Sequence, residues 1–255
     1  MKNKIWVSNQ LLNWEVDGSV MSSVSKEEWK RAYEIWNYAK NLIENNDDRE
    51  NLSQAIIALK RSYNQRHQLL SKIYPFDEIH FDSKVGRKRG LELLEQYNII
   101  RPLHIKKLLS IRNDIEHNDT VPPEKEKCLE LVDHVWSFLK ITDQKILNIP
   151  QQVIMKNEKY FYEIDFNFEN SSRNEVFFNF KGFCALKDIS FCFKEKYIEL
   201  QDSRIISNKN ELESEELFKP HVKYNPHGIF IEGCIKYGEV QYSLLYKILN
   251  DPWSI

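Results

Sequence analysis

The chain has 255 residues, which is enough for one large domain or two domains of ordinary size. Hydrophobic residues make up 42% of the sequence and aromatic residues 13%, a composition that excludes an intrinsically disordered chain. The formal net charge is −2, so bulk charge does not draw the protein to a polyanion. Any contact with nucleic acid must therefore come from local basic patches.

Cysteine usage and the N-terminal residues bear on cofactors and location. The four cysteines (Cys128, Cys184, Cys192 and Cys234) form no C-x-x-C pair, and the histidines are scattered. We therefore expect reduced thiols, and neither a metal site nor a bound cofactor. The first residues contain no apolar signal core, and no apolar run reaches the roughly 18 residues of a membrane span. These features favour a cytoplasmic protein that does not contact a membrane.

Residues 1–24 combine short apolar clusters with polar residues. Ile5-Trp6-Val7 and Leu11-Leu12 are the clusters, and Asp17-Gly18-Ser19 is a turn signal. We expect this segment to be an N-terminal arm packed onto the core. The alternative is an arm that binds a partner.

Two long helices are predicted next. Ser25 and Glu28 form a capping box, and apolar residues recur at three- and four-residue intervals from Trp29 to Ile43. A second helix is expected from about Arg49 to Ile73, before Pro75. Four charged or titratable side chains crowd its later part: Lys60, Arg61, Arg66 and His67. They indicate either a solvated face or the border of a groove that binds nucleic acid.

The connection between Pro75 and Gly90 is basic. It carries Lys84, Arg87, Lys88 and Arg89. A flexible loop of this kind can lie along an RNA backbone and neutralise phosphates, although a merely solvated loop explains the composition equally well. A short helix is expected over residues 91–97, and Pro102 suits the first turn of the next helix. Lys106 and Lys107 add positive charge to that helix.

The end of this next helix carries the densest functional signal. Apolar residues at 105, 108, 109, 111 and 115 predict a mostly buried face, which leaves Arg112, Asn113 and His117 as polar groups. Asn113 and His117 are four residues apart and so point the same way. Arginine binds phosphate oxygens through a planar fork, and histidine transfers protons near neutral pH. These three residues predict a phosphate site.

Arg112, Asn113, three further residues and His117 resemble the R-x4-H motif of HEPN domains, which are small helical bundles found in many prokaryotic toxin and antiviral ribonucleases. The surroundings agree: a helix pair precedes the motif, and Pro122-Pro123 separates it from an amphipathic helix over residues 124–140. The resemblance covers residues 25–146. His134 on the last helix is interpreted as a packed or surface residue.

After Ile149-Pro150 the period of the apolar residues changes from helical to alternating. Tyr160, Tyr162, Ile164, Phe166 and Phe168 alternate with polar residues, which is typical of a strand. Further strands are expected over residues 175–180, 188–193, 196–200, 228–235 and 239–245, and a short helix over 209–218. Residues 149–255 are therefore predicted to form a small antiparallel β domain. The expected fold class is α+β, a HEPN-like helical bundle followed by this β domain.

The resemblance implies a metal-independent endoribonuclease in which Arg112, Asn113 and His117 are catalytic. It also implies a homodimer joined through the bundle, because one motif supplies one histidine. We expect RNA as substrate, contacts from Lys84, Arg87, Lys88, Arg89, Lys106 and Lys107, a toxin or antiviral role, and an antitoxin or sensor as a further partner. Position 119 is Asp rather than the Tyr of one toxin–antitoxin branch, so the sequence does not match that branch. The alternative is a non-catalytic module that binds RNA or scaffolds an assembly.

Overall fold

The computed structural model describes residues 4–79, 90–118, 120–157, 160–166, 177–206, 228–236 and 238–250. The chain divides into two compact units. The helix unit comprises Ser22–Asp77, Gly86–Ile149 and Leu249–Ile255, and the sheet unit comprises Met1–Met21, Glu78–Val85 and Pro150–Ile248. None of the helices in the described ranges is long and apolar enough to cross a membrane.

The helix unit contains the helices that the sequence predicts, at nearly the predicted positions. They are α1 (Lys26–Asn45), α2 (Arg49–Ile73), α3 (Leu91–Gln96), α4 (Leu103–Asn118) and α5 (Lys125–Leu147). The capping box of α1 is formed, with the Glu28 amide 3.2 Å from Ser25 Oγ. Asp48 caps α2 by accepting a hydrogen bond of 3.0 Å from the Asn51 amide. Side-chain acceptors at both N-termini therefore fix where these helices begin.

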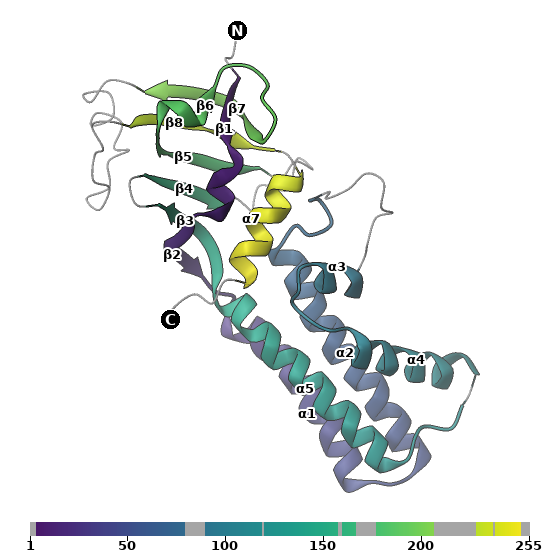
Figure 1. Ribbon diagram of the computed structural model, residues 1–255. Coiled ribbons are helices and arrows are strands. Elements are labelled where there is room, and N and C mark those ends of the chain that lie inside the picture. The colour runs from purple at the N-terminus through teal and green to yellow at the C-terminus, as the bar shows by residue number, and fades with distance from the viewer. Residues whose placement is uncertain are drawn as a thin grey trace. The chain divides into compact units, whose positions relative to one another are not determined.

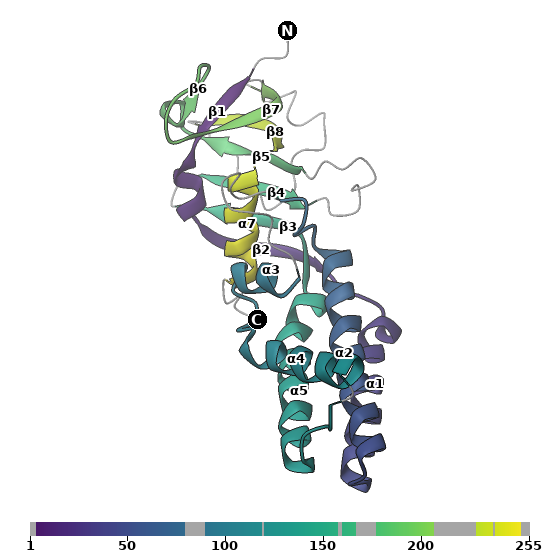
Figure 2. The same cartoon turned by 90° about the vertical axis from the view of Figure 1, so that its right-hand side faces the viewer.

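Helices α1, α2 and α5 form the core of the helix unit and run side by side in both views (Figures 1 and 2). Small residues on α1, Ala32 and Ala39, are fully buried and allow close packing. Leu59 of α2 and Val135 of α5 are also fully buried. Burial of this apolar stripe, rather than helix propensity alone, stabilises the three helices.

A buried polar network lies within this core, and it changes the interpretation of Arg66. Arg66 is fully buried, so it belongs neither to a solvated face nor to a groove. Its guanidinium donates to Asp143 Oδ1 at 2.8 Å and to the Leu139 carbonyl at 2.9 Å. Trp29 Nε1 and Tyr33 Oη also donate to the Asp143 carboxylate, at 2.9 and 2.6 Å. Donors from α1 and α2 thus converge on one acceptor on α5.

The sheet unit is built on an eight-stranded sheet of order β2-β3-β4-β5-β8-β7-β1-β6 (Figure 1). Its strands are β1 (Ile5–Ser8), β2 (Glu15–Ser22), β3 (Ile149–Lys156), β4 (Phe161–Phe166), β5 (Phe178–Cys184), β6 (Ile189–Ser190), β7 (Tyr197–Ile206) and β8 (Ile229–Ile235). Two 3-10 helices, η1 (Asn9–Asn13) and η3 (Leu186–Asp188), and the helix α7 (Gly238–Asn250) complete the described elements. The registers on both sides of β5 are regular and antiparallel.

The predicted fold class is wrong in its arrangement. The β region is not a small C-terminal domain, because the N-terminal segment enters the sheet: Ile5 pairs with Leu200, and Val7 with Ile198. The bundle implied by the family resemblance is not shown, since α1, α2 and α5 pack closely whereas α4 buries only Ile105 and Leu108. The molecule has a helical region and a large antiparallel sheet, which is a mixed α+β architecture.

The predicted strand over residues 239–245 is also wrong, because this segment lies in α7. Gln241, Leu244, Leu245, Ile248 and Leu249 are all buried. Their spacing of three and four residues matches the helical period. The predicted helix over 209–218 and strand residues 175–176 lie outside the described residues.

Candidate functional site

The predicted site lies in the last two turns of α4. This helix begins after Pro102, whose carbonyl accepts a hydrogen bond of 2.8 Å from the Lys106 amide. At its end the Asp114 carbonyl accepts from the Thr120 amide at 3.3 Å, and the Asp114 side chain accepts from the Asn118 amide group at 3.4 Å. Local hydrogen bonds therefore fix the exit of the chain from the motif helix.

Arg112 is held by two neighbours on its own helix. One terminal nitrogen donates to Asn113 Oδ1 at 3.1 Å, and the other forms an ion pair with Glu116 one turn later. The Arg112 side chain is 20% exposed, and its Nε is buried without a hydrogen-bond partner in the described part of the protein. The guanidinium is thus oriented at the edge of the surface, with one donor unused.

His117 is exposed in the last turn of α4. Within the described ranges, no hydrogen bond or ion pair joins His117 to Arg112 or Asn113. The structure therefore brings Arg112 and Asn113 into direct contact and leaves His117 at the same helix end with an exposed imidazole.

The helix around the motif is less covered than the sequence predicts. Ile105 and Leu108 are buried, whereas Leu109, Ile111 and Ile115 are only half-buried. The apolar face of α4 is therefore incomplete, and the motif lies on a half-exposed helix.

The residues predicted to bind RNA divide into two groups. Lys106 and Lys107 are exposed on α4, on the helix that carries the motif. Lys84, Arg87, Lys88 and Arg89 lie outside the described residues.

Sequence reasoning missed a histidine pair on this unit. The rings of His104 on α4 and His134 on α5 stack with their centroids 3.9 Å apart. Partial burial, with the nearby positive charge of His104 and Lys107, lowers the pKa of His134. No pattern in the sequence pointed to this pair, because its two members lie on different helices.

A cavity of about 320 Å³ lies in the sheet unit, and none of the residues predicted as catalytic lines it. Its walls come from η1, the residues before β4 and η3. Tyr160 and Tyr162, two aromatic residues of the alternation that predicted a strand, line this cavity.

No family model matches the sequence, and no curated protein or solved structure matches it either.

Proposed function

We propose that the protein is a metal-independent endoribonuclease with Arg112, Asn113 and His117 at its site. The observation that carries this proposal is the arrangement at the end of α4, where an oriented guanidinium that is 20% exposed and an exposed imidazole share two helical turns. The motif resembles that of HEPN nucleases, a family that often acts in toxin or antiviral defence.

The chemistry needs no external nucleophile, because RNA supplies its own 2′-hydroxyl. The 2′-oxygen attacks the adjacent phosphorus while its proton passes to a base, and the bond to the 5′-oxygen breaks as that oxygen receives a proton. The products are a 2′,3′-cyclic phosphate and a 5′-hydroxyl end. His117 transfers a proton, and Arg112 stabilises the charge that develops on the phosphate oxygens. Asn113 orients Arg112 through the hydrogen bond of 3.1 Å.

This reaction uses both an acid and a base, whereas one motif supplies one histidine. The proposal therefore includes a homodimer in which two copies of the motif face one cleft. Lys106 and Lys107 are exposed on the same helix and would contact RNA phosphates. The basic loop with Lys84, Arg87, Lys88 and Arg89 would extend this contact, and an antitoxin or a sensor would regulate it. Light scattering at micromolar concentration tests the dimer, and an active strict monomer would rule it out.

One observation favours a second function, a non-catalytic module that binds RNA or scaffolds an assembly. Glu116 already occupies part of the Arg112 guanidinium through the ion pair. For such a module, the Arg112–Glu116 ion pair only stabilises the end of α4. Replacement of His117 then has no effect on RNA cleavage.

A cleavage assay on single-stranded RNA in EDTA separates the two functions. His117→Ala should lower the cleavage rate by about two to four orders of magnitude, because it removes the proton-transfer group. His104→Ala is the matched control, since His104 is an exposed histidine on the same helix outside the motif. Cleavage by wild type and by His104→Ala, but not by His117→Ala, supports the nuclease. No cleavage by wild type, or equal cleavage by His117→Ala, contradicts it.

A further inference from the structure

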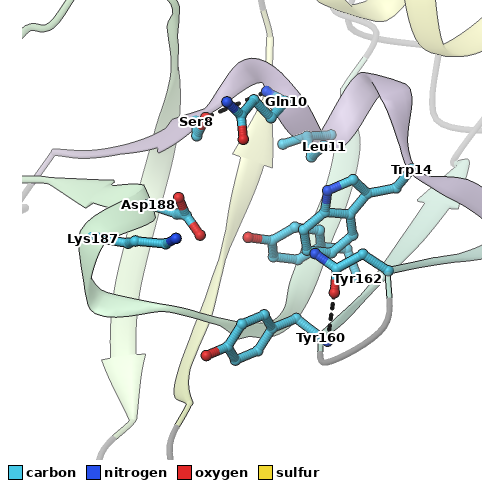
Figure 3. A pocket seen from close by; sticks show the side chains of 9 residues that line it. Ser8, Gln10, Leu11, Trp14, Tyr160, Tyr162, Lys187 and Asp188 are labelled. Atoms are coloured by element: carbon cyan, nitrogen blue, oxygen red, sulfur yellow. Dashed lines mark hydrogen bonds between the residues drawn. The ribbon is translucent and has the colours of Figure 1, made fainter.

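The cavity in the sheet unit has one charged wall and one aromatic wall (Figure 3). Lys187 and Asp188, on η3, extend into it from one side, opposite Trp14 and Tyr162. Tyr160 borders it below in this view, and Gln10 above. Its volume of about 320 Å³ is near the lower end of the roughly 300–1,000 Å³ typical of small-molecule sites.

The aromatic wall is rigid. Trp14 and Tyr162 stack with ring centroids 4.5 Å apart and an interplanar angle of 15°. Tyr162 is 2% exposed, and burial is the main reason that the pKa of its hydroxyl is raised. The Asn157 side chain accepts a hydrogen bond of 2.8 Å from the Tyr160 amide. Flat, ordered ring surfaces of this kind bind planar ligands by stacking.

The charged wall is oriented but unused. The Lys187 carbonyl accepts a hydrogen bond of 3.1 Å from Tyr197 Oη, and the Asp188 amide donates to the Ala185 carbonyl at 2.9 Å, so the backbone of η3 is fixed. Among the described residues, neither the Lys187 ammonium nor the Asp188 carboxylate forms an ion pair or a hydrogen bond. Asp188 is half-buried. A donor and an acceptor of opposite charge therefore lie side by side, facing aromatic rings.

We propose that this cavity binds a guanine ring. Unpaired bases are recognised by stacking on aromatic side chains and by hydrogen bonds to their Watson–Crick edge. Guanine presents an acceptor, O6, next to two N–H donors, N1–H and the N2 amino group. Lys187 donates to O6, as lysine does in other guanine contacts. Asp188 accepts from N1–H and N2–H, and Tyr160 and Trp14 supply the stacking surface, with the buried Tyr162 ring stacked on Trp14.

The other bases fit this pair of charges less well. Uracil presents a single N–H between two carbonyl oxygens, so the carboxylate gains one donor. Adenine and cytosine each present one amino group beside a ring nitrogen that accepts, and again the carboxylate gains only one donor. The site therefore favours guanine through the second N–H. The ring can come from a free guanine nucleotide or from a single-stranded RNA, and the recognition is the same.

Calorimetric titration of the full chain tests the proposal with GMP, AMP, CMP and UMP, and ribose 5-phosphate controls for contacts of the phosphate alone. GMP should bind at least about tenfold more tightly than the other nucleotides. A uridine hexamer with one central guanosine, compared with the all-uridine hexamer, forms the RNA arm. If GMP binds more tightly than the hexamer with one guanosine, the free nucleotide is the ligand. If that hexamer binds more tightly than GMP, the ligand is RNA. The inference does not depend on the nuclease proposal, because the titration measures binding without cleavage.

Asp188→Asn gives the sharper test. An amide keeps one acceptor and introduces a donor, so affinity for GMP should fall about tenfold or more. The variant should instead prefer xanthosine monophosphate, whose ring carries an oxygen acceptor in place of the N2 amino donor. Glu195→Gln is the matched control, because Glu195 is exposed, lies on the segment after η3 and does not line the cavity. It should bind GMP as wild type does.

Several results would overturn the proposal. They are equal binding of all four nucleotides, no binding of any at millimolar concentration, and an Asp188→Asn variant that keeps wild-type affinity for GMP. Loss of GMP binding without a gain of xanthosine monophosphate would overturn the assignment of the two N–H donors to Asp188. Tyr160→Ala, in a loop residue that is only half-buried, adds a separate check. Introduced into the wild-type chain, it should weaken binding of GMP, and introduced into the Asp188→Asn variant, it should weaken binding of xanthosine monophosphate. An unchanged affinity would show that Tyr160 does not stack on the ligand.

Discussion

Two arginine–carboxylate pairs of the helix unit have the same chemistry and different surroundings. In the α1–α2–α5 core, Arg66 is 0% exposed and Asp143 is 13% exposed, and they meet at 2.8 Å. On α4, the Arg112 and Glu116 side chains are 20% and 25% exposed. Trp29 and Tyr33 also donate to Asp143, whereas in the described part of the chain only Asn113 adds a hydrogen bond to the Arg112 pair.

This difference in burial means that the Arg66–Asp143 pair is structural, whereas the Arg112–Glu116 pair is accessible to solvent. A buried charge is stable only when its partners are all present, so Arg66 is committed to the core. A pair near the surface contributes little to stability and exchanges easily with water or an anion. The Arg112–Glu116 pair is therefore open to exchange with solvent, whereas the Arg66–Asp143 pair is not.

The largest expected effect comes from breaking the buried pair. Arg66→Ala should lower the free energy of unfolding by about 3–5 kcal/mol, because it removes the buried cation of the mostly buried Asp143 carboxylate and leaves only the half-exposed Lys140 at 4.0 Å among the described residues. Urea denaturation measures the loss. Arg61→Ala, on the exposed face of the same helix, is the matched control and should stay within about 0.5 kcal/mol of wild type. If Arg66→Ala changes the free energy of unfolding by less than about 1 kcal/mol, the hydrogen-bond network around Asp143 is not required for the stability of the fold.

A smaller effect should appear with pH at His67, one residue further along α2. Burial lowers the pKa of this imidazole in the folded state. The unfolded chain then binds a proton more readily, so the stability present above the ordinary histidine pKa is lost as the pH falls from 7 towards 5. His67→Gln should make the loss of stability shallower, by less than the Arg66→Ala effect, since the side chain is only half-buried.

Denaturation curves at pH 7, 6 and 5 measure this slope. His117→Gln replaces an exposed histidine and serves as control. If His67→Gln and wild type lose stability in parallel, burial of His67 does not contribute to the pH dependence.

The smallest effect on stability is expected at the motif pair, and there the activity sharpens the comparison. Arg112→Ala should cost only about 0.5 kcal/mol, because the pair is partly solvated. The same change should lower RNA cleavage by at least about 100-fold, as loss of an oxyanion-stabilising donor does. Melting curves paired with the cleavage assay measure both quantities.

Two variants complete this test. Glu116→Gln should keep cleavage at or above the wild-type rate, because it frees the guanidinium and removes a negative charge near the phosphate. Arg101→Ala, an exposed arginine before α4, is the control for a lost cation. A strongly destabilised Arg112→Ala variant would instead assign the pair to the fold and favour the scaffold function.

Part of the fold followed from the sequence because it depends on local interactions. The Ser25–Glu28 capping box and Pro75 set the start of α1 and the end of α2, and both are determined within a few residues. The alternation through Tyr162, Ile164 and Phe166 predicted β4, and all three side chains are buried. The candidate motif could also be predicted from the sequence, because its residues are spaced along one helix.

Other features could be decided only by contacts between distant parts of the chain. The segment with Ile5 and Val7 is too short to be identified as a strand from its sequence. Its hydrogen-bonding partners lie on β7, far along the chain. For Arg66 the sequence indicated a solvated face or the border of a groove, because the carboxylate that neutralises it, Asp143, is on another helix. The strand expected over residues 239–245 is likewise wrong, because this segment lies in α7 and buries Gln241, Leu244 and Leu245.

For function, the sequence by itself determined which residue types were available, and the tertiary structure decided which of them are free to act. Spacing on α4 put Arg112, Asn113 and His117 at one helix end, because a helix fixes the neighbours of each residue. Only the fold brought Trp14, Tyr162 and Asp188 to one cavity, since Trp14 is separated from the other two by more than a hundred residues of sequence. Hydrogen bonding between strands, which no local pattern encodes, places those segments together.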